Sequence, residues 1–251
     1  MSKCSLILGG TKGLGRSLAK ESLARDIRPL IVGRSVDRAS ADSALRGSQF
    51  CNADIRDAEH SPAHIAGAWR SHLGDTQTAA AQNFIVWNAG VLLRKPLADC
   101  TLADIDYVFE TFLRGPATVL IALHRLMMEF GKPYHLITVA STSSWHMRDN
   151  ETLYCAAKAG QAAFTRQFER ELVRDLPGSK ATLVNPGGIK TELFKGTGQD
   201  ISSFMDPDAV ARIIWDEVLG QTEPFKEIQI LRDEQGTPRV EYGPRAPEMP
   251  F

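Results

Sequence analysis

The feature that most constrains this chain is a glycine-rich run between a short apolar segment and a segment of helical period. Cys4–Leu8 is apolar, Gly9–Gly15 reads GGTKGLG, and a helical pattern follows over residues 14–25. Glycines let a backbone turn tightly and approach a pyrophosphate, whose charge the amides at a helix N-terminus stabilise. An ordinary loop can also be glycine-rich, but the position between strand and helix favours a phosphate-binding turn. We assign to this turn Gly9, Thr11, Lys12, Gly13, Leu14 and Gly15.

Beyond this turn, apolar runs rich in Ile, Leu and Val alternate with longer segments of helical period, as in a parallel sheet with crossover helices. The expected strands are Cys4–Leu8, Pro29–Val32, Ser48–Cys51, Asn83–Trp87, His135–Ala140, Ala181–Val184 and Glu227–Leu231. The expected helices lie near 14–25, 36–46, 58–73, 101–129, 152–175 and 207–219. The pattern predicts an α/β fold: a Rossmann-like, doubly wound, seven-stranded parallel sheet with helices on both faces. We expect one domain over 1–232 and a proline-rich, extended tail over 233–251.

Composition narrows the possible partners. The 251 residues include 29 basic and 30 acidic side chains, a balance that argues against nucleic-acid binding and favours a small-molecule partner. The four cysteines have no paired spacing and the six histidines no ligand spacing, so we predict no metal site. Residues 76–93 are uncharged but contain Gln and Asn, so a buried strand with its flanks is favoured over a membrane span. No secretory signal is visible, and we expect a cytoplasmic protein.

The end of the second expected strand bears on the choice of nucleotide. An acidic residue there would bind a ribose 2′-hydroxyl, but this chain has Arg34 and Ser35. Arg34 and Lys12 together would offset a 2′-phosphate, so we predict NADP. Alternatively, Arg34 and Lys12 are solvated surface residues, and the nearby Asp37 leaves NAD as a second possible cofactor. Asp54 and Ile55 follow the third strand and are assigned to the adenine side, although Asp54 could equally be a cap or turn carboxylate.

A tyrosine and a lysine stand four residues apart in the expected helix 152–175. This spacing puts Tyr154 and Lys158 on one helix face. A phenol titrates near pH ~10, and a nearby ammonium favours the phenolate. Ser141, at the end of the fifth strand, could hold a carbonyl oxygen, with Ser143 as its competitor. A serine-rich turn after a strand also has an ordinary structural explanation.

Together these residues resemble the short-chain dehydrogenase/reductase family, up to about residue 232. The resemblance is carried by Gly9-x-x-x-Gly13-x-Gly15, Asp54, Asn88-Ala89-Gly90, Ser141, Tyr154-x-x-x-Lys158 and Asn185–Thr191. It implies hydride transfer between a nicotinamide and a carbonyl or secondary alcohol, with Tyr154 as general acid or base. It also implies that Ser141 positions the substrate oxygen and that Lys158 binds the nicotinamide ribose. Asn88, Ala89 and Gly90 would support the cofactor, and Pro186, Gly187, Ile189 and Thr191 would hold the carboxamide side of the ring.

Three positions depart from the family pattern. Leu8 stands where a threonine is usual, and Trp87 replaces the first of two asparagines. More seriously, Phe112 occupies the place of a catalytic asparagine, which would disturb a water-linked proton path to Lys158. This departure suggests an alternative function, a catalytically weak NADP-binding sensor or scaffold. A sugar-nucleotide epimerase ranks last because it would need a larger substrate region.

Two further expectations concern the substrate and the assembly. Trp145, Met147 and Phe194 follow the assigned segments and could line an apolar substrate pocket, with core packing as the alternative. The helices near 101–129 and 152–175 are apolar on more than one face, and the family often pairs such helices between subunits. We therefore expect a homodimer or homotetramer.

Overall fold

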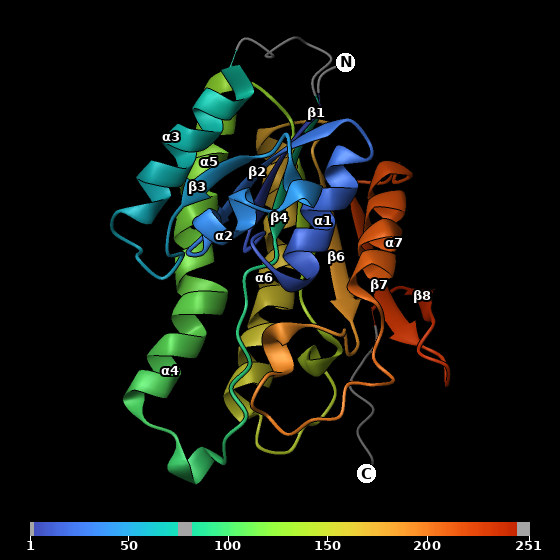
Figure 1. The fold of residues 1–251 in the computed structure, drawn as a ribbon. Coiled ribbons are helices and arrows are strands. Elements are labelled where there is room, and N and C mark those ends of the chain that lie inside the picture. The colour runs from blue at the N-terminus through green and yellow to red at the C-terminus, as the bar shows by residue number, and fades with distance from the viewer. Residues whose placement is uncertain (1–2, 75–81, 245–251) are drawn as a thin grey trace.

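The computed structural model describes residues 3–74 and 82–244, and one eight-stranded sheet forms its centre (Figure 1). The strand order is β3-β2-β1-β4-β5-β6-β7-β8. The strands are β1 Lys3–Leu8, β2 Ile27–Gly33, β3 Gln49–Asn52, β4 Gln82–Trp87, β5 His135–Val139, β6 Lys180–Pro186, β7 Phe225–Arg232 and β8 Pro238–Tyr242. The first seven are parallel, and β8 runs antiparallel to β7. The predicted fold class is confirmed, with one strand more than expected.

Helices cover both faces of the sheet (Figure 1). On one face lie α1 Gly13–Leu23 and α7 Pro207–Leu219. On the other lie α3 Ser61–Leu73, α5 Gly115–Phe130 and α6 Thr152–Asp175. Successive strand residues point to opposite faces, so in β1 Leu6 and Leu8 enter one core while Ile7 enters the other. This two-sided burial explains why the strands are continuous apolar runs without alternation.

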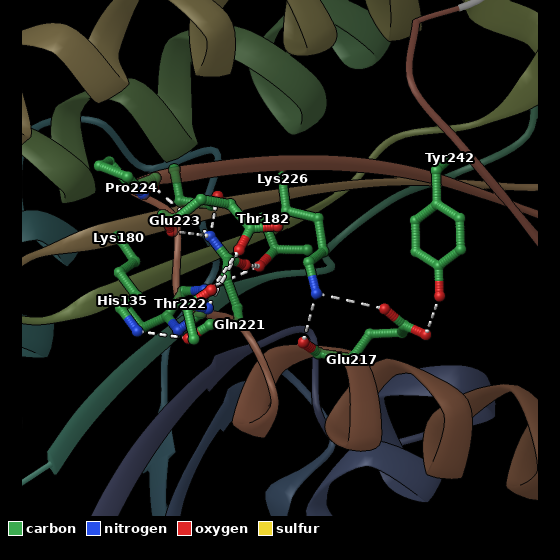
Figure 2. Close-up of polar contacts among 11 residues, drawn as sticks. His135, Lys180, Thr182, Glu217, Gln221, Thr222, Glu223, Pro224, Lys226 and Tyr242 are labelled. Atoms are coloured by element: carbon green, nitrogen blue, oxygen red, sulfur yellow. Dashed lines mark hydrogen bonds and ion pairs between the residues drawn. The ribbon is translucent and has the colours of Figure 1, made fainter.

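The C-terminal segment differs from the expected extended tail. Residues 238–242 form β8, in which Val240 lies opposite Ile230 of β7 and packs against the core. Figure 2 shows that the Tyr242 hydroxyl reaches α7, where it donates to a carboxylate oxygen of Glu217 at 2.9 Å. Val240 and the Tyr242 hydroxyl hold this strand in place. A single aliphatic residue and a single hydroxyl are too weak a sequence pattern to predict a strand. Residues 245–251 of the expected tail lie outside the described residues.

The helix expected over 101–129 is divided in two. α4 spans Leu102–Phe109, a π-helical segment follows over Glu110–Arg114, and α5 begins at Gly115. Pro116 has no N–H to donate to the carbonyl of Phe112, which favours a local change in the hydrogen-bonding pattern. The Thr111 hydroxyl donates back to the Tyr107 carbonyl at 2.7 Å. Phe112 lies within this π-helical segment.

Buried polar groups tie the amino ends of two central strands to the loop after α7 (Figure 2). His135 Nε2 lies 2.7 Å from the Thr182 hydroxyl, which donates to Gln221 Oε1 at 2.6 Å. Burial lowers the pKa of His135 to about 3, so the imidazole is neutral. This network lies away from the carboxyl edge of the sheet and serves the fold.

The uncharged run 76–93 is only partly described. Residues 76–81 lie outside the described residues, and Gln82–Trp87 form the buried central strand β4. Within the part of the chain that the structure describes, no helix has the length and apolar character to cross a membrane.

Two helical glycines give a matched test of the packing. A Cβ atom at Gly115 would lie 2.0 Å from the carbonyl oxygen of Ile55, whereas one at Gly67 in α3 would meet nothing within 4 Å. Gly115→Ala should therefore lower the free energy of unfolding by about 1–3 kcal/mol. Gly67→Ala should raise it by about 0.5–1 kcal/mol. Urea unfolding at unchanged m-value measures both, and equal stability of the Gly115 variant and the wild type would refute the close contact.

Candidate active site

A cavity of about 790 Å³ opens at the carboxyl ends of the parallel strands. The strand order reverses between β1 and β4, the place where open α/β sheets bind ligands. The volume lies within the usual range for cofactor and small-molecule sites. The predicted residues that line it are Gly9, Thr11, Lys12, Gly13, Leu14, Arg34, Ser35, Asp54, Ile55, Asn88, Ala89, Gly90, Ser141, Tyr154, Lys158, Pro186, Gly187, Ile189, Thr191 and Phe194.

The glycine-rich turn has the form that a phosphate requires. Gly9 adopts a left-handed conformation, with φ of +79°, and its amide donates to the Val32 carbonyl at 2.9 Å. No side chain caps the N-terminus of α1, so its first-turn amides stay available to an anion. Gly15 does not itself line the cavity. A Cβ there would lie 2.1 Å from the Gly9 carbonyl oxygen, so Gly15 seats the helix against the turn.

The two predicted cations both line the cavity. The Arg34 side chain is 55% exposed and lies 3.7 Å from Asp54 Oδ2. Lys12 is 64% exposed and lies 4.0 Å from Glu192. Both cations are therefore accessible to a ligand and only weakly paired.

Asp54 combines the two predicted possibilities, because it lines the cavity and also stabilises its own turn. Its carboxylate accepts from the Arg56 guanidinium at 2.6 Å and from the Arg56 amide at 3.1 Å. Arg56, and more weakly Arg34, hold the pKa of Asp54 below its ordinary value. The carboxylate is thus ionised and partly engaged within the chain.

Tyr154 lies buried in the wall of the cavity with Ser141 beside it. Burial raises the pKa of the phenol to about 12, and hydrogen bonding with Ser141 opposes that rise. Ser141 also accepts from the Ser143 amide at 3.1 Å, and Ser143 itself lines the cavity. The phenol is therefore neutral near pH 7, the state in which it can donate a proton.

Lys158 is also buried, with its Nζ held at three sides. It donates to the Val139 carbonyl and to Gln161 Oε1, both at 3.0 Å, and lies 4.6 Å from the centroid of the Phe112 ring. Burial lowers the pKa of Lys158 to about 7. We expected Lys158 to lower the pKa of Tyr154, but burial raises that pKa and is the largest effect on each of the two groups. Sequence reasoning missed Gln161, although its spacing from Tyr154 and Lys158 puts it on the same helix face.

Phe112, at the position where the family pattern has an asparagine, forms the inner wall of the site. Its ring meets the Tyr154 ring edge to face, with centroids 5.6 Å apart. A Cβ at Gly90 would lie 2.9 Å from this ring, so the small residue makes space for the aromatic one. An apolar ring therefore stands where the family pattern has a polar amide.

Two of the three predicted pocket residues lie outside the cavity. Met147 is 81% exposed, and Trp145 packs toward the His146 ring, with centroids 5.9 Å apart. A 3₁₀ turn at Thr142–Ser144 reverses the chain, so His146 and Arg148 line the cavity in their place. The predicted assignment of Trp145 and Met147 is therefore wrong, whereas Phe194 does line the cavity.

A family model described as short chain dehydrogenase matches residues 3–202, which is most of the 251-residue chain. The chain belongs to the short-chain dehydrogenase/reductase family. Short-chain dehydrogenases are NAD(P)-dependent oxidoreductases, so this protein is an enzyme of that class. The predicted family is thereby confirmed.

Other short-chain dehydrogenases and oxidoreductases are similar along most of their length. An uncharacterised oxidoreductase of Staphylococcus epidermidis is 25% identical over 203 residues, covering 78% of this chain and 81% of that protein. A sorbitol dehydrogenase of Cereibacter sphaeroides is 24% identical over 251 residues, covering 96% of this chain and 92% of that protein. An alcohol dehydrogenase of Thermococcus sibiricus, solved with 5-hydroxy-NADP, shares the fold with a TM-score of 0.75 and 21% identity; the match covers 91% of this chain and 95% of that one.

The buried Lys158 should make the stability of the nucleotide-free enzyme depend on pH. Its pKa falls from 10.5 to about 7 on folding, so between these values the unfolded chain holds a proton that the folded chain has released. Stability therefore rises with pH across this window, with a slope of about 1.4 kcal/mol per pH unit from this one group.

Lys158→Met removes this contribution. Wild type should gain stability relative to the variant at about that slope between roughly pH 7 and pH 9. Chemical unfolding at several pH values measures the difference between the two proteins. Parallel stability curves would show that Lys158 keeps its ordinary pKa in the folded chain.

Proposed function

We propose that this enzyme is an NADP-dependent oxidoreductase that interconverts a ketone and a secondary alcohol, with Tyr154 as general acid or base. The observation that carries the proposal is that Ser141, Tyr154 and Lys158 line the same cavity as the phosphate-binding turn. The cavity can therefore hold a dinucleotide and a small substrate together.

The turn and the cavity walls suit this cofactor. The free amides at the start of α1 would hold the pyrophosphate, and Arg34 and Lys12 would face the 2′-phosphate. The segment Pro186–Thr191 would hold the carboxamide side of the nicotinamide ring. When bound, the nicotinamide supplies or accepts a hydride.

The chain's own residues would handle the proton. In the reducing direction Tyr154 would donate its phenolic proton to the substrate oxygen, while the Ser141 hydroxyl would hold that oxygen in place. A phenol with a pKa of about 12 keeps its proton at neutral pH, which suits an acid better than a base. Oxidation of the alcohol requires the phenolate and should therefore gain from higher pH.

The alternative function, a sensor or scaffold with weak catalysis, rests on Phe112 alone. The oxidoreductase and dehydrogenase names of the relatives favour the enzyme. The homodimer or homotetramer and the single domain over 1–232 stay predictions, whereas the expected tail contributes β8 to the sheet.

Replacing the phenol tests the proton transfer. Tyr154→Phe should lower kcat by about 10²–10⁴-fold, because the acid is lost, while NADPH binding stays near wild type. Steady-state kinetics over a panel of ketones and a fluorescence titration with NADPH measure the two effects. Tyr134→Phe is the matched control, because Tyr134 is equally buried but lies outside the cavity. Full turnover in the Tyr154 variant would rule out the proposed acid.

Replacing Arg34 tests the choice of nucleotide. Arg34→Ala should weaken NADPH binding about tenfold or more and leave NADH binding nearly unchanged, because only NADPH carries the 2′-phosphate. Arg70→Ala removes an equal charge from the surface of α3, outside the cavity, and should change neither affinity. Equal loss for both nucleotides in the Arg34 variant would contradict the assignment.

A further inference from the structure

The surroundings of the Lys158 ammonium are unusual for a buried charge. Lys158 is 5% exposed, and its Nζ donates to the Val139 carbonyl and to Gln161 Oε1. Burial lowers its pKa, and both oxygens to which Nζ donates are neutral. The protein groups in contact with the ammonium are therefore two neutral oxygens and one aromatic ring.

The buried position of Gln161 is energetically unfavourable for an amide side chain. It is 0% exposed on α6, and its neighbours on the buried face include Ala157 and Ala162. Its Nε2 has no hydrogen-bond partner among the described residues, so half of the amide is buried unsatisfied. Such a group destabilises a fold unless its other contacts compensate. Packing alone would be served better by an apolar side chain, so the bond from Lys158 is the contact that distinguishes Gln161.

Phe112 closes another side of the same ammonium. Its ring, 0% exposed, lies 4.6 Å from Lys158 Nζ and packs edge to face with Tyr154. The face of an aromatic ring attracts a cation. The ring itself has no polar group that could anchor a water beside the amine. The carbonyl of Gln161 thus becomes the side-chain acceptor available to Lys158.

We propose that Gln161 is a positioning residue of this active site: its side-chain carbonyl holds the Lys158 ammonium in place, and Phe112 closes the adjoining side to solvent. The inference rests on the proposed function, together with the role that the family resemblance implies for Lys158, which is to bind the nicotinamide ribose. The Gln161 carbonyl bonds more strongly to the ammonium than to the neutral amine, so it opposes the loss of the proton that burial favours.

The groups that face Lys158 are few, so its titration can be traced. Its Nζ contacts Gln161 of α6, the Val139 carbonyl of β5 and Phe112 of the π-helical segment, and Tyr154 lies one turn earlier on the buried face of α6. Of these only Tyr154 can titrate, and its pKa of about 12 places it outside the range of interest. Two further charged groups, Glu151 and Arg148, shift the pKa of Tyr154.

Two substitutions at Gln161 test the proposal in opposite directions. Gln161→Met keeps the length of the side chain and removes the acceptor, so the pKa of Lys158 should fall by about one unit. Gln161→Glu places a carboxylate there, and the pKa should rise by about one to two units. The measurement is NMR titration of lysines labelled with carbon-13 at Cε in the nucleotide-free protein, with the Lys158 signal assigned from Lys158→Met.

The pH profile of ketone reduction gives a second readout. Activity that needs the ammonium is lost as pH rises through the pKa of Lys158. The falling limb should therefore move to lower pH in Gln161→Met and to higher pH in Gln161→Glu. NADPH binding should weaken in Gln161→Met at the pH where the variant amine is neutral.

Thr165→Val is the matched control. Thr165 lies one turn further along α6 and is 0% exposed; its hydroxyl donates to the backbone carbonyl of Gln161 and lies 2.9 Å from the Thr138 hydroxyl. Its loss should loosen the helix without moving the pKa of Lys158. Equal pKa values in wild type and Gln161→Met would overturn the proposal, as would a shift of the same size in Thr165→Val.

Failure of the proposal and failure of the proposed function give different results. The pKa of Lys158 could shift as expected in the Gln161 variants while the protein shows no ketone reductase activity. That result would contradict only the proposed function. If the protein reduces ketones but the pKa of Lys158 is unchanged in the Gln161 variants, only the role of Gln161 is contradicted. If Gln161→Met does not fold, the absence of an upward shift in Gln161→Glu overturns the proposal, and its presence supports it.

Discussion

Close backbone contacts that leave no space for a Cβ atom organise the carboxyl edge of this sheet. Gly15 brings α1 against the Gly9 carbonyl, which also accepts from the Asn88 side chain at 3.0 Å. Gly115 brings the start of α5 against the Ile55 carbonyl. The first contact points the free amides of α1 into the cavity, and the second fixes the π-helical segment that presents Phe112. Both ends of the candidate site thus depend on the absence of a side chain.

Burial shifts the pKa values of the two titratable groups of the site in opposite directions, and in each case it favours the uncharged form. It raises the pKa of Tyr154 and lowers that of Lys158, as expected when a low-dielectric environment disfavours an ion. The polar neighbours act against burial: Ser141 toward the phenol, Gln161 toward the ammonium. The active site is therefore balanced between desolvation and a few well-placed hydrogen bonds, with no buried ion pair between acid and base.

Much of this arrangement could be predicted from the sequence. The strands are apolar runs because both faces are buried, and the glycine turn and the Tyr154–Lys158 spacing follow from local geometry, which is why most predicted residues line one cavity. The missed features depend on tertiary contacts. The break before α5 lies where Gly115 packs against the Ile55 carbonyl, and β8 is seated mainly by Val240 and Tyr242. Trp145 and Met147 were misplaced because a 3₁₀ turn sets which side chains face inward. The sequence showed that Phe112 is unusual, but not that its ring lies against Lys158.

The eighth strand also changes how the sheet ends. Without it, the apolar β7 would present a row of unpaired backbone groups to any chain that could pair with them. β8 is five residues long, begins with Pro238 and carries Arg239 and Glu241. Short, charged strands with a proline are poor templates for further pairing. A late stretch of sequence with few aliphatic residues thus covers the apolar edge of β7 with a strand that disfavours further pairing.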